Sequence, residues 1–430
     1  MKTITEEITF KELFSMRNMK ILGINPPVED FAFYDLWSKP AGLLYLLNRM
    51  RMNGNEVYLL DCIREASNGK RSFGREKIEN IEIEKPFVYR GIKRKYHRFG
   101  LSEMGIKERL TTIPRPDAVF ITSAMTYWYG GVEWMISILK RELPGVPVIL
   151  GGVYARLCPD HAESLGADYI VCDNWIPDSP YPAMDLYEDL PYGITMTSFG
   201  CPLSCSYCAS RLLWPTYTRR PVYDVLCEID FQVRLGAKDI AFYDDALLLD
   251  KTRYFYPLCR ELNSKYKDGI RFHTPNGLHV REIDAECAGM LKETGFETIR
   301  LSLESIDPKI ADASSGKVAR EEYAKAVRYL LDAGYSREEC ETYILLGLPG
   351  QSIDSVKETI NFVHSSGGKP RLAEFSPIPG TPSFEAAATR MPELREEPLL
   401  HNNSVYSSWL SGDISPEVLQ GLKDLAKSNR

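Results

Sequence analysis

Three cysteines lie within eight residues of one another in the middle of this 430-residue chain. Cys201, Cys205 and Cys208 follow an apolar run and share a loop with Gly200 and Pro202. Thiolates at this C-x3-C-x2-C spacing favour an iron-sulfur cluster or a zinc ion. A 4Fe-4S cluster held by three cysteines keeps one iron open to a small molecule, whereas an electron carrier or a structural zinc normally has every position filled. The spacing therefore indicates a reactive centre.

The stretch TSFGCPLSCSYCASR, with the aromatic Tyr207 directly before the third cysteine, resembles the signature of the radical S-adenosylmethionine (SAM) enzymes. The resemblance implies that Cys201, Cys205 and Cys208 bind a 4Fe-4S cluster, and that SAM binds to the open iron near Tyr207. The reduced cluster would cleave SAM, and the resulting 5'-deoxyadenosyl radical would take a hydrogen atom from the substrate. A zinc knot or a redox-sensing group of cysteines is the alternative, but no fourth Cys or His follows within ligand reach.

The composition is that of a globular protein with two or three domains. The hydrophobic fraction is 44%, and the formal net charge of −7 gives no reason to expect nucleic-acid binding. The other cysteines are scattered singly, which is typical of reduced thiols in a cytoplasmic protein. We find no apolar run of signal-peptide or membrane-spanning length. These features predict a soluble cytoplasmic protein.

Upstream of the cysteines, apolar strands alternate with helical patterns. This alternation indicates a parallel sheet covered on both faces, a doubly wound, flavodoxin-like or Rossmann-like domain over residues 19–172. In such a domain the ligand lies beyond the carboxyl ends of the strands, where the strand order reverses. The loops that start at Asn25, Ser123 and Gly151 would meet there. The expected strands cover residues 19–25, 56–61, 117–123, 146–152 and 167–172, and the helices 39–52, 131–143 and 159–165.

This domain, placed before the cysteine stretch, resembles the cobalamin-binding domain of the cobalamin-dependent radical SAM subclass. The matching pieces are TSAMTYWYGG, with Ser123 and Thr126, and LGGVYA, with Gly151 and Gly152. The resemblance implies that these four residues contact cobalamin, because a glycine pair lets the backbone approach a flat macrocycle. A tight turn and a helix cap at Ser123 are the simpler interpretations. The D-x-H-x-x-G signature is absent, so no lower axial ligand of cobalt is implied, and the domain can have kept its fold without the cofactor.

Residues 193–381 repeat a strand followed by a helix six times, which matches the partial (β/α)6 barrel of the radical SAM family. In a parallel barrel the chemistry takes place on the loops at the carboxyl ends of the strands. The cysteine loop follows the first strand, as this rule requires. The expected strands cover residues 193–198, 239–244, 270–275, 298–304, 341–347 and 371–377.

The family resemblance also implies where SAM binds. Asp244, at the end of the second strand, would accept hydrogen bonds from the SAM amino group, although it or Asp245 can equally cap a helix. On the fourth strand Arg300, Ser302 and Glu304 share one face. Ser302 and Glu304 match the contacts to the carboxylate and ribose of SAM, with an internal Arg300–Glu304 ion pair as the alternative. His273 and Asn276 also face the cavity, but no residue is assigned a catalytic role.

The remaining segments have weaker signals. Residues 1–18 form an N-terminal extension, the proline-rich stretch 173–192 an ordered linker, and 382–430 a short, mostly helical tail that would cover the open side of the barrel. Residues 62–112 form a basic and aromatic insertion. This insertion either contacts an anionic substrate, a partner or nucleic acid, or is only a solvated excursion.

Together these features predict a radical SAM enzyme that uses a 4Fe-4S cluster, SAM and cobalamin to methylate an unactivated carbon. A cobalamin-independent rearrangement, cyclisation or oxidation is the alternative within the family. An iron-sulfur electron carrier or sensor is the alternative from another class. The resemblance implies a small-molecule, lipid or peptide substrate and an electron donor such as flavodoxin or ferredoxin.

Overall fold

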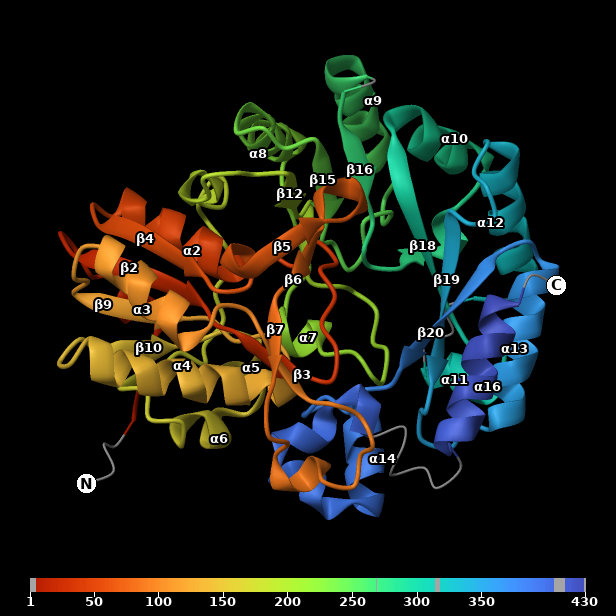
Figure 1. Cartoon of the computed structure of the whole chain (residues 1–430). Helices are drawn as coiled ribbons and strands as arrows, with labels where there is room; N and C mark the ends of the chain where they lie inside the picture. The colour runs from red at the N-terminus through yellow and green to blue at the C-terminus, as the bar shows by residue number, and fades with distance from the viewer. Residues whose placement is uncertain (1–4, 268, 314–317, 406–413, 429–430) are drawn as a thin grey trace. The chain divides into compact units, whose positions relative to one another are not determined.

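The computed structural model describes residues 5–267, 269–313, 318–405 and 414–428, so parts of the expected N-terminal extension and tail lie outside the described residues. The chain divides into two compact units (Figure 1). The first unit comprises Met1–Leu190 and Glu393–Asn402, and the second comprises Pro191–Pro392 and Asn403–Arg430. Each unit is built around one main sheet of parallel strands.

The sheet of the first unit has six strands in the order β1-β11-β10-β9-β2-β4. The five expected strands are confirmed and adopt the flavodoxin-like order, which reverses between β2 and β9. The sixth strand, β1, comes from the N-terminal extension; two residues are too few to show a pattern in the sequence. The bounds are β1 (Glu6–Glu7), β2 (Lys20–Asn25), β4 (Glu56–Asp61), β9 (Ala118–Ile121), β10 (Val148–Leu150) and β11 (Tyr169–Ile170).

Helices cover both faces of this sheet, as the continuous apolar strands predict. In β9, Ala118 and Phe120 face one core cluster and Val119 and Ile121 face the other, because side chains alternate along a strand. Gly23 of β2 allows one helix to approach closely, since a methyl group there would lie 2.6 Å from Leu47. The first core includes α1 (Phe10–Leu13) and α2 (Ala41–Met52), and the second includes α3 (Glu103–Thr112), α4 (Tyr129–Glu142), α5 (Val153–Leu157) and α6 (Pro159–Glu163).

The basic insertion folds onto the carboxyl end of the central strand β2. The chain leaves β2 through Pro26 and Pro27 into β3 (Val28–Asp30), which pairs antiparallel with a strand of the insertion in the order β3-β8-β7. Tyr96 and Phe99 are buried there, so this part is more than a solvated excursion. The other elements are β5 (Ser67–Lys70), β6 (Glu76–Ile78), β7 (Asn80–Glu82) and β8 (His97–Phe99).

The linker and part of the tail also belong to the first unit. The linker follows α2, where Ser179 donates to the carbonyl of Tyr45 and Asn48 donates to that of Tyr181, at 3.2 and 2.9 Å.

The tail is not one element, because residues 393–402 belong to the first unit and the residues on either side of them belong to the second. We call residues 393–402 the C-terminal strap; its short helix η8 (Pro398–His401) contacts η4 (Thr126–Trp128) at the carboxyl end of β9.

The second unit contains the six expected barrel strands, all parallel and in chain order from β12 to β20. Among the described residues β12 and β20 form the two edges, so the sheet is open as a partial barrel requires. A short strand, β17 (Leu278–His279), pairs with β18. The bounds are β12 (Tyr192–Thr195), β15 (Asp239–Phe242), β16 (Arg271–His273), β18 (Phe296–Glu304), β19 (Cys340–Leu346) and β20 (Lys369–Glu374).

Helices follow the strands of this unit at the expected places (Figure 1). The tail helix α16 (Pro416–Lys427) packs against β20 and α13, where His364 bonds the carbonyl of Leu425 at 2.9 Å. No helix among the described residues has the length and apolar character needed to cross a bilayer. The main helices are α8 (Val222–Arg234), α9 (Phe255–Tyr266), α10 (Ala285–Thr294), α12 (Arg320–Asp332), α13 (Ile353–Ser365) and α14 (Pro382–Arg390).

Candidate functional site

The cysteine loop follows β12 and is closed at its base by a short antiparallel ladder. Residues of β13 (Ser198–Phe199) pair with those of β14 (Thr218–Arg219). Inside this ladder the ring of Phe199 lies 5.2 Å from that of Trp214. Gly200 has a φ of +81°, and a methyl group there would lie 2.9 Å from Trp214. The chain therefore enters the loop through a turn that only glycine fits.

The three thiols differ in exposure. Cys205 is buried, Cys201 and the neighbouring Tyr207 are half-buried, and Cys208 is exposed. The backbone N–H of Ser210, the first residue of α7 (Ser210–Leu213), lies 3.4 Å from Cys208 Sγ and donates to it. Hydrogen bonds to ligating sulfurs are one means by which proteins set the reduction potential of iron-sulfur clusters. The three thiols are chemically suitable ligands for a 4Fe-4S cluster.

A single metal ion is the alternative occupant of this loop. Within the described part of the chain, no three His, Cys, Asp or Glu side chains are grouped so that one ion could be held. In a 4Fe-4S cluster each thiolate binds a separate iron, so its three cysteines need not converge on one point. A structural zinc needs four ligands around one centre.

Asp244 anchors the base of the cysteine loop. Its carboxylate accepts hydrogen bonds from the N–H of Thr197 at 2.9 and 3.0 Å, from the Thr197 hydroxyl at 2.5 Å and from the Ser198 hydroxyl at 2.8 Å. Burial raises the pKa of Asp244, and these hydrogen bonds oppose the rise. The side chain predicted to hold the SAM amino group is thus already engaged in fixing the loop.

Asp245 bonds a different part of the cysteine segment from Asp244. It accepts a hydrogen bond at 2.6 Å from the hydroxyl of Ser210, the residue whose N–H donates to Cys208. The loop that carries both carboxylates is held by Asn276, whose amide donates to the carbonyl of Tyr243 at 2.9 Å. Asp245 is thus connected through Ser210 to the segment that contains Cys208.

Ser302 and Glu304 lie at the carboxyl end of β18 and are buried. A methyl group at Gly277 would lie 2.0 Å from Ser302 Oγ, so the loop after β16 passes directly over this serine. Glu304 has a φ of +66°, a left-handed conformation that is strained for a non-glycine residue and is found mostly at functional sites. Arg300 pairs with Glu341 of β19 at 3.3 Å and donates to Tyr343 at 2.6 Å.

In the first unit, three of the four predicted cobalamin residues meet at the carboxyl ends of β9 and β10. The hydroxyl of Ser123 donates to the carbonyl of Gly151 at 2.7 Å. Gly152 has a φ of +100°, and a methyl group there would lie 2.3 Å from the carbonyl oxygen of Ser123. The glycine pair and the serine therefore form one tight backbone contact, at the strand ends where a flavodoxin-like sheet binds its ligand.

Thr126, the fourth residue, is buried against the C-terminal strap. Its hydroxyl lies 2.9 Å from His401 Nδ1, while His401 Nε2 lies 2.7 Å from the carbonyl of Leu394. Because a carbonyl only accepts, Nε2 carries the hydrogen and Nδ1 accepts from Thr126. Burial lowers the pKa of His401 to about 4, which keeps the ring neutral. The sequence gives no sign of this contact.

Three further contacts fix the strap over the same strand ends. Asn402 donates to Asp30 at 3.0 Å, and the hydroxyl of Tyr89 donates to the carbonyl of Leu399 at 2.7 Å. The hydroxyl of Tyr129 lies 3.1 Å from Glu397 Oε1. Asp30 also accepts from Trp128, so this carboxylate joins β3, η4 and the strap. The strap is thus bonded to β3, to η4 after β9 and to Tyr89 of the insertion.

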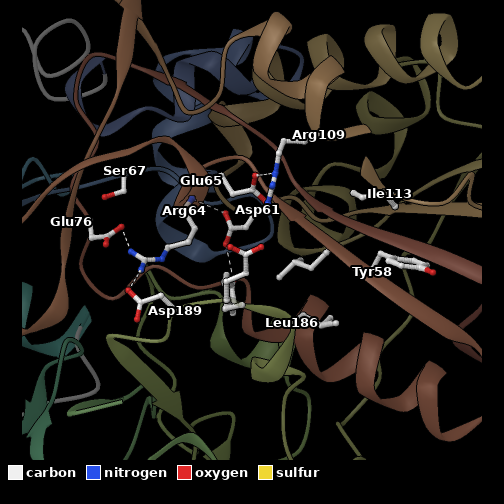
Figure 2. Close-up of a pocket in the computed structure, with 13 residues that line it drawn as sticks. Tyr58, Asp61, Arg64, Glu65, Ser67, Glu76, Arg109, Ile113, Leu186 and Asp189 are labelled. Atoms are coloured by element: carbon white, nitrogen blue, oxygen red, sulfur yellow. Dashed lines mark hydrogen bonds and ion pairs between the residues drawn. The ribbon is translucent and has the colours of Figure 1, made fainter. Parts of the chain in front are cut away.

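A cavity of about 360 Å³ lies beside the carboxyl end of β4 (Figure 2). Asp61 lines it and accepts hydrogen bonds from Asn25 at 2.8 Å and Tyr187 at 2.7 Å. None of the predicted SAM or cobalamin residues lines this cavity. Two arginines on its wall are paired with carboxylates, Arg64 with Glu76 and Asp189, and Arg109 with Glu65.

Comparison with protein families identifies the second unit. Residues 195–363 match the radical SAM superfamily. The match begins at the end of β12 and continues into α13, so it includes the cysteine loop and the carboxylates that follow β15. These residues form a radical SAM domain.

Two curated relatives are methyltransferases by name. Cytidylyl-2-hydroxyethylphosphonate methyltransferase of Streptomyces wedmorensis is 22% identical over 430 residues, 82% of this chain and 78% of that protein. An uncharacterized methyltransferase of Pyrococcus horikoshii is 26% identical over 222 residues, 49% of this chain and 46% of that protein. The chain thus spans just under half the length of this second relative.

Solved structures share the fold of the chain. TsrM of Kitasatospora setae, a radical SAM methyltransferase solved with cobalamin and a 4Fe-4S cluster, has a TM-score of 0.63 at 15% identity, over 87% of this chain and 75% of that one. OxsB, a cobalamin-dependent radical SAM enzyme solved with aqua-cobalamin and SAM, has a TM-score of 0.58 at 12% identity, over 90% of this chain and 57% of that one. The fold class predicted from the sequence is confirmed.

Proposed function

We propose that this protein is a cobalamin-dependent radical SAM methyltransferase of the cytoplasm that methylates an unactivated carbon of a small molecule. The observation that carries the proposal is that one chain joins a three-cysteine loop after the first strand of a radical SAM domain to a flavodoxin-like sheet. Similarity to proteins named as methyltransferases, and to cobalamin-containing folds, supports it.

The bound cofactors would supply radical chemistry through the cluster and SAM, and methyl transfer through cobalamin. Cys201, Cys205 and Cys208 would hold the cluster, and the Asp244 anchor would keep their loop in place. Asp245, Ser302 and Glu304 would orient SAM, because Asp245 follows β15 and bonds Ser210, and Ser302 and Glu304 lie at the carboxyl end of β18 in the same parallel sheet. The edge formed by Ser123, Thr126, Gly151 and Gly152 would bind cobalamin.

The test uses the full chain, reconstituted with iron and sulfide under anaerobic conditions and reduced with dithionite in place of a flavodoxin or ferredoxin. With SAM and hydroxocobalamin present, we expect both 5'-deoxyadenosine and S-adenosylhomocysteine, since the first reports radical cleavage and the second reports methyl donation. Both products should be lost in Cys205→Ala together with the iron.

Two results would favour one of the alternative functions. Deoxyadenosine without S-adenosylhomocysteine would favour a cobalamin-independent radical reaction. A reconstituted cluster that produces neither compound would favour an electron carrier or sensor and would contradict the proposal.

A further inference from the structure

The cysteine loop has a second attachment, from a segment that follows the last strand of its unit. The backbone N–H of Ser383 donates to the carbonyl of Ser206 at 2.9 Å. The hydroxyl groups of the same two residues are 2.8 Å apart and share a hydrogen bond. Ser206 lies between Cys205 and Cys208, so this pair of bonds fixes the middle of the cluster-binding segment.

The segment that makes these bonds is itself rigid. Ser383 is the second residue of α14, and Thr381 caps this helix by accepting from the N–H of Phe384 at 3.2 Å. The Thr381 hydroxyl also donates to the carbonyl of Ile378 at 2.8 Å. Thr381, Ser383 and Phe384 are all buried. A buried and capped first turn is a fixed support, which a mobile tail would not be.

A second contact lies on the other side of the third cysteine. Gly380 has a φ of +81°, and a methyl group there would lie 3.0 Å from the side chain of Leu212. Leu212 belongs to α7, four residues after Cys208. Residues 380–383 therefore contact the chain on both sides of Cys208, the most exposed of the three cysteines.

We propose that Ser383 is a positioning residue for the iron-sulfur cluster, and that residues 380–383 form a clamp that holds Cys208 in its ligating position. The inference rests on the proposed function. It assigns a role to the start of the tail, for which the sequence offers no signal, because Ser206 and Ser383 are 177 positions apart.

The clamp has two measurable consequences. A hydrogen bond of this kind contributes a factor of roughly five to an equilibrium, so its loss should speed the release of iron to a chelator by about fivefold. A looser loop admits water, which favours the more highly charged reduced cluster. We therefore also expect a more positive reduction potential.

The experiment compares the reconstituted wild type with Ser383→Ala, Ser206→Ala and the double variant. Each is measured for iron content, the rate of iron release to a chelator and the reduction potential by spectroelectrochemistry. Thr389→Ala is the matched control, because it removes a hydroxyl from the same helix that bonds only within the helix, to the carbonyl of Glu385 at 2.9 Å.

Faster iron release and a raised potential in both single variants, with no further change in the double variant, would support the clamp. Behaviour of Ser383→Ala and Ser206→Ala like that of Thr389→Ala would overturn it. Should Ser383→Ala fail to fold, Ser206→Ala alone decides. A wild type that takes up no cluster would instead refute the proposed function, before any variant is compared.

Discussion

At the scale of single residues, Asp244 and Asp245 are adjacent but serve different purposes. Asp244 is almost completely buried and binds Thr197 and Ser198, whereas Asp245 bonds Ser210 beside Cys208. A carboxylate that accepts several hydrogen bonds in a buried place is part of the scaffold. Asp245 is half-buried and bonds the residue whose N–H donates to Cys208, and its proposed role in SAM binding rests on this arrangement.

The two acidic residues should therefore respond differently to the same substitution. Asp244→Asn places an amide where the N–H of Thr197 needs an acceptor, so we expect a loss of about 2–3 kcal/mol in the free energy of unfolding. Asp245→Asn should change that free energy by less than about 1 kcal/mol and weaken SAM binding at least about fivefold. Denaturant unfolding and equilibrium SAM binding measure both. Equal effects of the two variants would refute the division of roles.

His401 should make the stability depend on pH. Its folded pKa of about 4 lies below the ordinary value of 6.5, so the folded state resists a proton that the unfolded state accepts. The stability that the neutral ring contributes is complete above pH 6.5 and is lost as the pH falls from 6.5 toward 4. At about pH 5 the loss amounts to about 2 kcal/mol.

Unfolding of the wild type and of His401→Gln over this pH range measures the effect. The variant should lose less stability on acidification, and the difference between the two proteins isolates His401 from every other titrating group. Parallel pH curves would show that burial does not keep the His401 ring neutral.

Single residues also show which contacts cannot be predicted from the spacing of residues in a motif. The cysteine set was identified because its ligands lie within eight residues of each other. Asp244 reaches Thr197 across 47 positions, and Arg300 reaches Tyr343 across 43, so neither partner was identifiable from a motif. A local sequence motif can predict a set of ligands, whereas the partners of a buried polar side chain depend on which distant parts of the chain the fold brings together.

At the scale of elements, the two parallel sheets were predictable from the sequence, but the structures of the strap and the insertion were not. The strand at 56–61 was predicted with its observed bounds, and the other expected strands were predicted to within three residues at each end. The strap was not, since its bonds join positions up to 372 residues apart. The structure of the insertion was not predicted either, because strands of three residues such as β7 and β8 are too short to show an alternation.

The turn between β10 and α5 offers a test of the first unit. Gly152→Ala combines a positive φ with an overlap against the carbonyl of Ser123, so we expect a loss of about 3 kcal/mol or more in stability. Gly145→Ala is the matched control, since Gly145 has a φ of +79° but open space around its Cα. It should lose only about 1 kcal/mol. Equal losses would mean that the close contact at Ser123 is absent.

At the scale of the whole molecule, the chain carries two parallel sheets, each with polar residues gathered at the carboxyl ends of its strands. In the second unit these are the cysteine loop and the carboxylates of the radical SAM domain. In the first unit the carboxyl ends of β9 and β10 carry Ser123, Gly151 and Gly152, and Thr126 nearby is bonded to His401 of the strap. In the proposed function each of these two edges binds a cofactor.

The most direct measurement of this claim is an anaerobic titration of the cluster-reconstituted protein with hydroxocobalamin, followed by desalting and absorption spectroscopy. The account predicts that stoichiometric cobalamin stays with the wild type and that Gly152→Ala retains much less, because its ligand edge is displaced. A wild type that keeps its cluster but releases all cobalamin would contradict the account and leave the first unit as a scaffold or a substrate-binding domain.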